Sequence, residues 1–479
     1  MKYLDKSDLI TKSNKIKKIF FYRICGTGMG AAAILLKEAG FEVEGGDINF
    51  RPPMSDYLES TKIPLHNLKD IDLDYLKTFD LIVVGNVVSK KGQDAHLIES
   101  LNVDFCSFPA AIGAFILKNK KVVGVSGTHG KTTTTYLMVQ VFEKLGFNVG
   151  YFIGGVIENR PSASLGENDY FFIEADEYDC AYFEKFSKFL NYEINDLILT
   201  SLEFDHADIY NSIDEIKEQF RKLILSLDKS SIIADNDYQA TREIYQEFPK
   251  RCDWIFYSIN NSPKIKNISI GENKMTTFSL EIDGKDYKFE TNLTGVQNIL
   301  NLSSVILYAF KEKFSYEKIK TSILNLKMVK KRQEEKGFFQ GARIIDDFAH
   351  HPRAIKYTID SIKKKYLNKD VVVALEPSSS TSRSSIFQEA YVEVLSDVNT
   401  VILVEPQNAT TVKNCTDLDC KKLIRDLRIK NKNAYLVSKI SELKEKIEKE
   451  ANEERVVLFL SNGQFLGLWE SDFAHSIRP

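Results

Sequence analysis

The chain of 479 residues has few cysteines, no long apolar run and almost no excess charge. Its six cysteines form no CxxC pair, which argues against a disulfide framework and against a zinc site. No stretch reaches the ~20 apolar residues of a membrane span, and the N-terminus lacks the apolar core of a signal peptide. A net charge of -3 gives no global reason to expect binding to nucleic acid or anionic lipid, which usually needs a concentrated basic surface; a local basic site is the alternative. The sequence therefore predicts a cytoplasmic protein without a nucleic-acid or membrane partner.

Apolar, strand-like runs alternate with amphipathic stretches along the whole chain. Such alternation is typical of parallel sheets flanked by helices, and the length is sufficient for about three domains. New blocks begin at the strand-like KVVGVS and at the charged KMVKKRQEEKG. We therefore predict an α/β fold with domains at residues 1–118, 119–326 and 327–479. The first and third are expected to be Rossmann-like, and the central one to be of the P-loop ATPase type.

The segment VSGTHGKTTTT, residues 125–135, joins a strand-like run to a helical one. Its Gly-Lys-Thr suggests a phosphate loop, although Val125 stands where the usual pattern has its first glycine. A turn between a strand and a helix would present free N–H groups and the positive end of the helix dipole to an anion. Lys131 would then face the outer phosphates, and Thr132 would hold magnesium. The alternative is a tight turn with a solvated lysine.

A second glycine turn lies near the N-terminus. Gly26, Gly28 and Ala31 fit the pattern G-x-G-x-x-[GA], and Asp47 follows at a distance typical of a ribose-binding carboxylate. Taken alone, the pattern suggests an NAD-dependent oxidoreductase. The presence of another nucleotide loop in the next block makes that interpretation less economical. A glycine turn needed only for close packing is the remaining alternative.

Acidic residues and histidine gather after the next two strand-like runs. The carboxyl ends of parallel strands meet at one edge of a sheet, so these side chains should converge near Lys131, where oxygen ligands and an imidazole could hold magnesium. Solvated loop charges are the alternative. The residues concerned are Glu174, Asp176, Glu177, Asp179, Glu203, Asp205 and His206. Four of the seven histidines, at 129, 206, 350 and 351, lie in the candidate site segments, which favours chemistry.

Taken together, the motifs resemble the Mur ligase family, the ATP-dependent, amide-forming acid-amino-acid ligases of peptidoglycan synthesis. The resemblance spans nearly the whole chain and rests on ICGTGMG, GGD, GTHGKTTT, EADEYD, EFDH and DDFAHHP. GTHGKTT is the family's own shortened phosphate loop. Within the family, EADEYDCAYFEKFSKF, LEFDHADIY and LSNGQFLGLW are similar to the branch that joins a recycled tripeptide, L-alanyl-γ-D-glutamyl-meso-diaminopimelate, to UDP-N-acetylmuramate. The branch that adds L-alanine to UDP-N-acetylmuramate is the alternative within the family.

The resemblance implies a reaction through an acyl phosphate, with ATP and Mg²⁺ as cofactors, in a monomer or homodimer. It makes the N-terminal domain the UDP-sugar site and the central domain the ATP site, on which the C-terminal domain closes with the peptide. The implied catalytic residues are Lys131, Glu174 and His206, and the implied magnesium ligands are Thr132, Glu174 and His206. The implied ATP contacts are Gly127, Thr128, His129, Gly130, Lys131, Thr132, Thr133, Asn298, Asn301, Arg332 and Asp347. The implied UDP-sugar contacts are Gly26, Thr27, Gly28, Met29, Gly30 and Asp47, and the implied peptide contacts are His350, His351 and Ser378.

Three positions depart from the family pattern. Gln297 in GVQNILN stands where histidine is usual, which weakens one expected adenine contact. Ser164 and Ser378 replace arginines, and serine cannot reproduce the bidentate grip of arginine on a carboxylate. Either another arginine compensates, or the accepted peptide differs; the candidates are Arg160, Arg353 and Arg383. A non-catalytic relative that binds a nucleotide sugar is a further alternative, and the intact Lys131, Glu174 and His206 argue against it.

Overall fold

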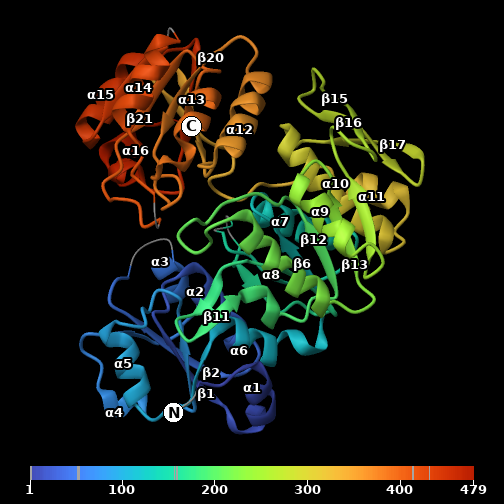
Figure 1. Cartoon of the computed structure of the whole chain (residues 1–479), viewed down its shortest axis with the longest axis vertical. Helices are drawn as coiled ribbons and strands as arrows, with labels where there is room; N and C mark the ends of the chain where they lie inside the picture. The colour runs from blue at the N-terminus through green and yellow to red at the C-terminus, as the bar shows by residue number, and fades with distance from the viewer. Residues whose placement is uncertain are drawn as a thin grey trace.

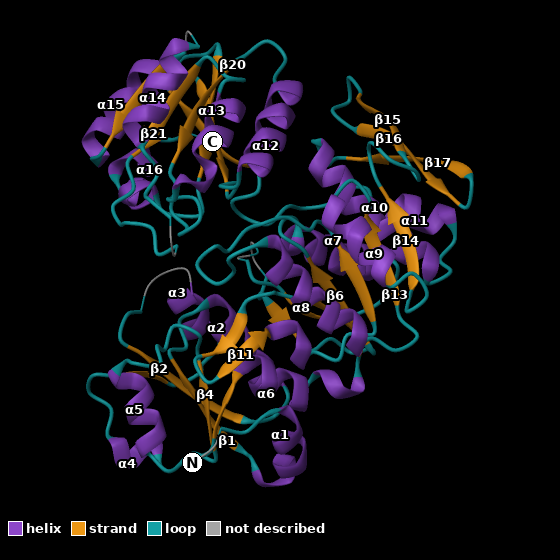
Figure 2. Ribbon diagram, viewed as in Figure 1, coloured by secondary structure: helices purple, strands orange, loops and turns teal. Residues whose placement is uncertain are grey.

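Three sheets follow one another along the chain. The computed structural model describes residues 3–50, 54–155, 157, 160–412, 415–430 and 432–478. In Figure 1 the blue N-terminal part lies at the bottom, the green and yellow central part in the middle and at the right, and the orange and red C-terminal part at the upper left. Figure 2 shows helices packed around the strands of each part. The predicted α/β fold with parallel sheets is therefore confirmed.

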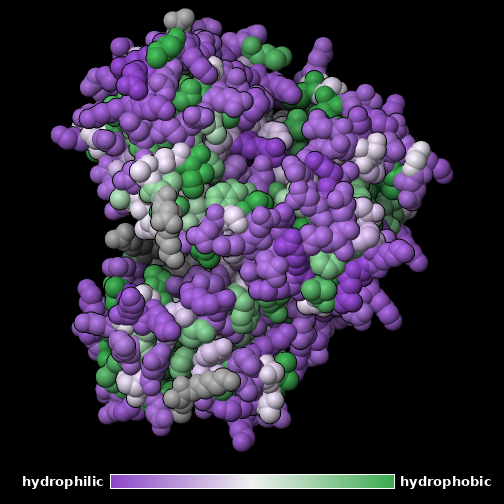
Figure 3. All heavy atoms as spheres, viewed as in Figure 1, coloured by the Kyte–Doolittle hydropathy of each residue, from purple (hydrophilic) through white to green (hydrophobic). Residues whose placement is uncertain are grey.

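Hydrophilic side chains cover most of the molecular face drawn in Figure 3. Over the residues that the structure describes, no helix is both long and apolar enough to cross a membrane.

The N-terminal sheet is parallel throughout, with the strand order β3-β2-β1-β4-β5. Its strands are β1 (Lys18–Tyr22), β2 (Glu42–Asp47), β3 (Leu65–Asn67), β4 (Leu81–Val84) and β5 (Phe105–Ser107). The helices of this part are α1 (Lys6–Lys12), α2 (Thr27–Glu38), α3 (Met54–Ser60), α4 (Leu73–Leu76), α5 (Gln93–Ser100) and α6 (Phe108–Phe115). The strand order reverses beside β1, so the glycine turn between β1 and α2 lies where open α/β sheets bind ligands.

The central sheet has the order β14-β13-β12-β6-β9-β7-β8; β8 is antiparallel to β7, and the other pairings are parallel. Its strands are β6 (Lys121–Ser126), β7 (Gly150–Phe152), β8 (Ala163–Ser164), β9 (Tyr170–Glu174), β12 (Asp196–Leu199), β13 (Ser231–Asp235) and β14 (Asp253–Tyr257). The helices are α7 (Lys131–Lys144), α8 (Ile213–Ser226), α9 (Gln239–Glu247), α10 (Val296–Lys311) and α11 (Tyr316–Ser322). Because β6 lies between β12 and β9, the carboxyl ends of these three strands meet at one edge.

Two smaller antiparallel units accompany the central sheet. They are the hairpin of β10 (Asp179–Ala181) and β11 (Glu184–Ser187), and the three strands β15 (Ile265–Ile270), β16 (Thr276–Ile282) and β17 (Lys285–Thr291). The hairpin returns the chain toward the acidic segment that follows β9, which brings Lys188 beside that segment.

The C-terminal sheet has the order β18-β19-β23-β20-β21-β22 and is parallel except for β18. Its strands are β18 (Glu334–Phe339), β19 (Ala342–Asp347), β20 (Asp370–Leu375), β21 (Thr400–Val404), β22 (Asn433–Val437) and β23 (Arg455–Leu460). The helices are α12 (Pro352–Lys365), α13 (Gln388–Leu395), α14 (Cys420–Ile429), α15 (Ile440–Glu450) and α16 (Asp472–Ser476). The inner strands are continuous apolar runs because helices cover both faces.

Asp346, near the end of β19, buries a carboxyl group in this sheet. Neither of its carboxylate oxygens has a hydrogen-bond partner among the described residues, and burial raises the pKa of Asp346 to about 7. The folded state therefore holds the proton more tightly than the unfolded chain. The stability from this proton is full below the unfolded pKa near 4 and is lost as the pH rises through about 7.

Replacement of Asp346 with asparagine is therefore expected to stabilise the protein increasingly as the pH rises. From pH 5 to pH 8, the free energy of unfolding of the variant should gain about 2 to 3 kcal/mol on that of the wild type. Denaturant unfolding at each pH measures this difference. Asp370→Asn, at an exposed carboxyl in the same sheet, is the matched control. A difference between Asp346→Asn and wild type that does not vary with pH would contradict the prediction.

Candidate functional site

The turn between β6 and α7 has the geometry of a phosphate loop. The predicted strand at 121–126 and the helix that follows are both confirmed. Gly127 and Gly130 have φ values of +132° and +82°, which side chains other than hydrogen rarely allow. A Cβ at Gly127 would lie 2.6 Å from the Ser201 carbonyl oxygen, and one at Gly130 would lie 2.5 Å from Asn301 Oδ1. The shortened loop thus depends on its two glycines for both backbone conformation and space.

Lys131, the first residue of α7, is held inside the site. Its ammonium donates to the Gly127 carbonyl oxygen at 2.6 Å and lies 3.1 Å from Glu177 Oε2. Burial by itself lowers the pKa of Lys131, but the carboxylates of Glu177 and Asp176 outweigh burial and raise that pKa above its usual range. Lys131 is therefore a permanent positive charge at the mouth of the glycine turn.

The three predicted magnesium ligands are arranged around this charge. Glu174, the last residue of β9, accepts a hydrogen bond from the Gly154 N–H at 2.8 Å and another from the Thr132 hydroxyl. Burial raises the pKa of Glu174, so its charged form lacks full compensation within the protein. His206 Nε2 is buried and lies 3.1 Å from Glu177 Oε1. A hydroxyl, an undercompensated carboxylate and an imidazole fit a divalent cation beside phosphate oxygens.

A cavity of about 410 Å³ brings these groups together with both other domains. Ten of the eleven residues predicted to contact ATP line it, namely Thr128, His129, Gly130, Lys131, Thr132, Thr133, Asn298, Asn301, Arg332 and Asp347. Glu174, Asp176, Asp205 and His206 also line it, as do Thr27 and Gly28 from the N-terminal part and His350 and His351 from the C-terminal part. The predicted convergence at the carboxyl edge of the central sheet is therefore confirmed for Glu174, Asp176, Asp205 and His206, and Glu177 and Glu203 also lie there, in contact with Lys131 and His129. Asp179 instead pairs with Lys185 on the β10–β11 hairpin.

The remaining predicted residues lie around the cavity rather than in its wall. Gly127 belongs to the loop between β6 and α7 and packs against Thr200 and Ser201 outside the cavity wall. Gly26, Met29 and Gly30 belong to the β1–α2 turn and to α2. Asp47 accepts from the Cys25 N–H at 3.0 Å and from the Ile48 N–H at 2.8 Å, so it braces that turn. Ser378 follows β20, near Gly463.

The C-terminal part contributes a preorganised loop after β19. Asp347 accepts from the N–H groups of Gln333 at 2.7 Å and Ala349 at 2.8 Å. The Arg332 guanidinium lies 4.6 Å from the centre of the Phe348 ring, and burial lowers the pKa of Arg332. Burial also lowers the pKa of His350, so this imidazole is neutral near pH 7. Burial lowers the pKa of His351 as well, so the loop presents two neutral imidazoles to the cavity, and Arg332, which precedes β18, adds one cation.

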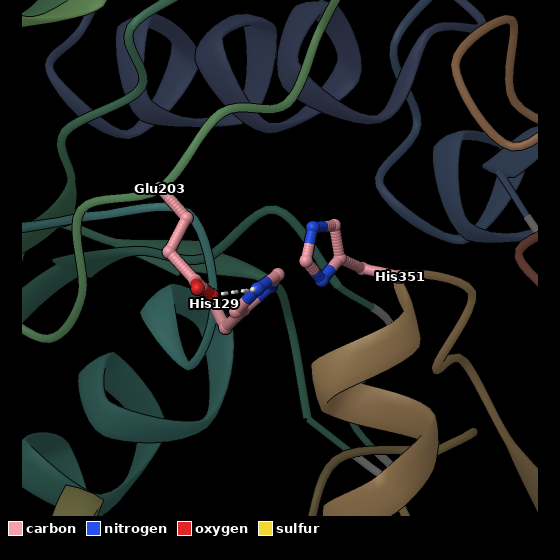
Figure 4. Close-up of side chains that lie close together, drawn as sticks. All are labelled: His129, Glu203 and His351. Atoms are coloured by element: carbon pink, nitrogen blue, oxygen red, sulfur yellow. Dashed lines mark hydrogen bonds and ion pairs between the residues drawn. The ribbon is translucent and has the colours of Figure 1, made fainter. Parts of the chain in front are cut away.

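His129, Glu203 and His351 join the phosphate loop to the C-terminal part, as Figure 4 shows. Their potential ligand atoms lie within 4.8 Å of one another, a spacing compatible with a metal ion. However, Arg353 Nη1 already lies 2.8 Å from Glu203 Oε1, and its charge competes with a cation for this carboxylate. His129 Nε2 lies 3.2 Å from the other oxygen of Glu203. We therefore interpret the group as a polar contact between the domains.

One functional residue was missing from the site predicted from sequence, and two were predicted to converge there without a role. Lys188 is the missing one and contacts Asp176 at 2.6 Å. Glu177 contacts both Lys131 and His206, and Glu203 forms the contact between domains; nothing local distinguished these two from their acidic neighbours. Lys188 carried no signal because the hairpin, and not sequence spacing, places it there.

Two of the three arginines considered as replacements are occupied elsewhere. Arg160 donates to Glu143 at 2.8 Å and to the Tyr151 hydroxyl at 3.0 Å. Arg353 forms the ion pair with Glu203 at 2.8 Å. Neither guanidinium is free to receive a substrate carboxylate without loss of an existing contact.

Known proteins resemble this chain over all three parts. The sequence matches the family descriptions "Mur ligase family, catalytic domain" over residues 18–119, "Mur ligase middle domain" over 125–309 and "Mur ligase, glutamate ligase domain" over 331–463. It is 31% identical to the UDP-N-acetylmuramate–L-alanyl-γ-D-glutamyl-meso-2,6-diaminoheptandioate ligase of Escherichia coli, over 94% of this chain and 96% of that protein. It is 30% identical to the UDP-N-acetylmuramate–L-alanine ligase of Lactobacillus gasseri, over 86% and 90%. The crystal structure of a murein peptide ligase from Psychrobacter arcticus has a TM-score of 0.70 at 26% identity, over 96% and 98%.

Proposed function

Because the chain belongs to the Mur ligase family, we propose that it joins the tripeptide L-alanyl-γ-D-glutamyl-meso-diaminopimelate to UDP-N-acetylmuramate with consumption of ATP. The observation that carries this proposal is the single cavity in which the phosphate loop, the acidic strand ends and the C-terminal histidine loop face one another. The choice of the tripeptide is supported by the similarity to ligases of that name, which extends over 94% of the chain.

In the proposed reaction, the lactyl carboxylate of UDP-N-acetylmuramate attacks the γ-phosphorus of ATP. An acyl phosphate forms and ADP leaves. The free amine of the peptide then attacks the acyl carbon, an amide bond forms and inorganic phosphate leaves. Both steps depend mainly on positioning and on neutralisation of phosphate charge, which is what a buried lysine beside ordered backbone N–H groups provides.

The proposed roles follow the position of each group. Lys131 and the loop N–H groups bind the β- and γ-phosphates. Thr132, Glu174 and His206 would hold Mg²⁺, which when bound supplies further neutralisation of phosphate charge. His350 lines the same cavity and is neutral near pH 7, so it would be able to accept a proton from the attacking amine.

In this proposal, each substrate binds mainly to a domain of its own. Residues 1–118 would bind the UDP sugar through Gly26, Thr27, Gly28, Met29, Gly30 and Asp47. Residues 119–326 would bind ATP, with the adenine near Asn298 and Asn301; Gln297 orients the second of these by donating to Asn301 Oδ1 at 3.2 Å. Residues 327–479 would close on ATP through Arg332 and Asp347 and hold the peptide near His350, His351 and Ser378. Assembly of the site from three domains is the reason to expect closure on substrate binding.

Phosphate release in the presence of ATP, Mg²⁺ and UDP-N-acetylmuramate tests the proposal. With the tripeptide as acceptor, we expect kcat/KM to exceed that with L-alanine by at least about 100-fold, because a site built for charged groups discriminates strongly against an acceptor that lacks them. Reactions without UDP-N-acetylmuramate control for simple ATP hydrolysis. Release with L-alanine alone would assign the protein to the L-alanine-adding branch, and release with neither acceptor would refute the ligase proposal for both.

A further inference from the structure

The helix α12 carries the side of the C-terminal part that borders the site cavity. Tyr357 and Thr358 on α12 line the cavity together with Asn298 of α10. Further along, α12 approaches the turn before α10 so closely that a Cβ at Gly295 would lie 2.4 Å from Ser361 Oγ. Two helices from different domains therefore share one cavity, and the width of the cavity depends on how α12 docks on the central part.

Arg353, in the first turn of α12, is a side chain that crosses from this helix to the central part. Its Nη1 lies 2.8 Å from Glu203 Oε1, and its guanidinium carbon lies 4.8 Å from the centre of the Tyr238 ring. Both partners belong to the central part, one after β12 and the other just before α9. One guanidinium thus forms an ion pair and a cation–π contact at the start of α12. The Arg353 side chain is 42% exposed, so dissolved salt can weaken the ion pair.

Glu203 is itself fixed to the phosphate loop. Its backbone N–H donates to Thr128 Oγ1 at 2.9 Å, and its second carboxylate oxygen lies 3.2 Å from His129 Nε2. Burial by itself raises the pKa of Glu203, but His129 and Arg353 outweigh burial and lower that pKa below its usual range. In Figure 4, Glu203 and His129 lie across from His351 at the start of α12. Glu203 is therefore a charged acceptor that is aligned before the helix docks.

The remaining ion pairs of α12 stay within the C-terminal part. Those recorded among the described residues are Lys356 with Asp360, Lys356 with Asp397, and Lys365 with Glu335. Within the part of the chain that the structure describes, the pair with Glu203 is thus the one ion pair between this helix and the central part.

We propose that the ion pair between Arg353 and Glu203 docks α12 on the central part and thereby raises the affinity of the cavity for ATP. This inference rests on the proposed function, in which ATP is bound between these two domains. A ligand held by two domains binds only while they are together, so its apparent dissociation constant falls as the docked fraction rises. Neither Arg353 nor Glu203 lines the cavity, so both are positioning residues that act through the helix.

Arg353→Met is expected to raise the dissociation constant of a non-hydrolysable ATP analogue with Mg²⁺ about 5- to 20-fold. The affinity for UDP-N-acetylmuramate should not change, because that substrate is expected to bind in the N-terminal part. Calorimetric titrations measure both affinities. Arg353→Lys keeps the charge and should recover part of the loss. Lys356→Met, which breaks an ion pair of the same helix within the C-terminal part, is the matched control and should leave both affinities unchanged.

Two further measurements separate the ion pair from a general disturbance of the helix. In a Glu203→Gln background, Arg353→Met should cause little further loss, because the charged partner is already gone. The ratio of the Arg353→Met dissociation constant to that of the wild type should also fall toward one between about 0.05 and 0.5 M salt, since screening weakens the pair in the wild type only. Additive losses, a ratio that does not depend on salt, or an unchanged affinity in Arg353→Met would overturn the inference.

Small-angle X-ray scattering of the protein without ligands tests the docking separately from ATP. The radius of gyration of the wild type should increase with salt, whereas that of Arg353→Met should be larger at low salt and change less. If the wild type binds no ATP analogue, the proposed function fails, and the ATP part of the inference fails with it. Scattering that differs between the two proteins then supports docking by the ion pair, and identical scattering refutes it. Equal, measurable affinities for the analogue would refute the inference alone and leave the proposed function intact.

Discussion

Replacement of Lys131 with methionine is expected to lower kcat for phosphate release by about 100- to 1,000-fold. Methionine keeps the length and apolar stem of lysine but removes the charge that faces the developing phosphate negative charge. The ammonium is held by the Gly127 carbonyl and by Glu177, so in the wild type it needs no reorganisation as the reaction proceeds. Steady-state assays with all substrates saturating measure the effect. Lys222→Met, at an exposed lysine on α8, is the control.

The same substitution is also expected to destabilise the protein, because it leaves Glu177 buried with a weakened counter-charge. Loss of one partner of a buried pair costs about 3 to 5 kcal/mol. The double variant Lys131→Met/Glu177→Gln removes both charges and should recover most of this stability, but none of the lost kcat. If the double variant regained activity together with stability, Lys131 would have a structural role only. If the folded Lys131→Met variant kept the wild-type kcat, Lys131 would have no role in neutralising the phosphate charge.

Replacement of Glu174 with glutamine is expected to lower kcat by roughly 1,000-fold and to raise the Mg²⁺ concentration needed for half-maximal rate at least tenfold. Loss of a charged metal ligand removes several kcal/mol of charge stabilisation, and each 1.36 kcal/mol corresponds to a factor of ten in rate. Glutamine keeps one acceptor oxygen for the hydrogen bond from the Gly154 N–H. A magnesium titration of phosphate release separates weaker metal binding from slower chemistry.

The free energy of unfolding shows whether the Glu174→Gln variant loses activity because its fold is disrupted. Because burial raises the pKa of Glu174, a neutral side chain is less costly there than a carboxylate, and the variant should unfold without Mg²⁺ at no lower free energy than the wild type. Glu167→Gln, at an exposed carboxyl before β9, is the matched control. A Glu174→Gln enzyme with an unchanged magnesium requirement would rule out Glu174 as a ligand, as would a requirement shifted equally in the control.

Much of the central site was predictable because it depends on local sequence. The strand, the two glycines and the Gly-Lys-Thr lie within about ten residues of one another, so the loop can be recognised before the fold is known. The positions of Glu174 and His206 could also be predicted from the sequence, because parallel strands place their carboxyl ends at one edge of the sheet. The predicted UDP-sugar residues were brought only partly to the cavity: Thr27 and Gly28 line it, while Asp47 braces the turn.

The α/β alternation, the phosphate loop and the family can all be read from the residues alone, since each depends on neighbours along the chain or on motifs of a few residues. The pairing of charges across the fold is visible only in the folded protein. The tertiary structure placed Glu177 on Lys131 and Glu203 between His129 and Arg353. It also left Arg383 free while Arg160 and Arg353 are occupied. These pairings join residues far apart in the chain, so they depend on strand order and on how the domains dock, which residue spacing does not encode.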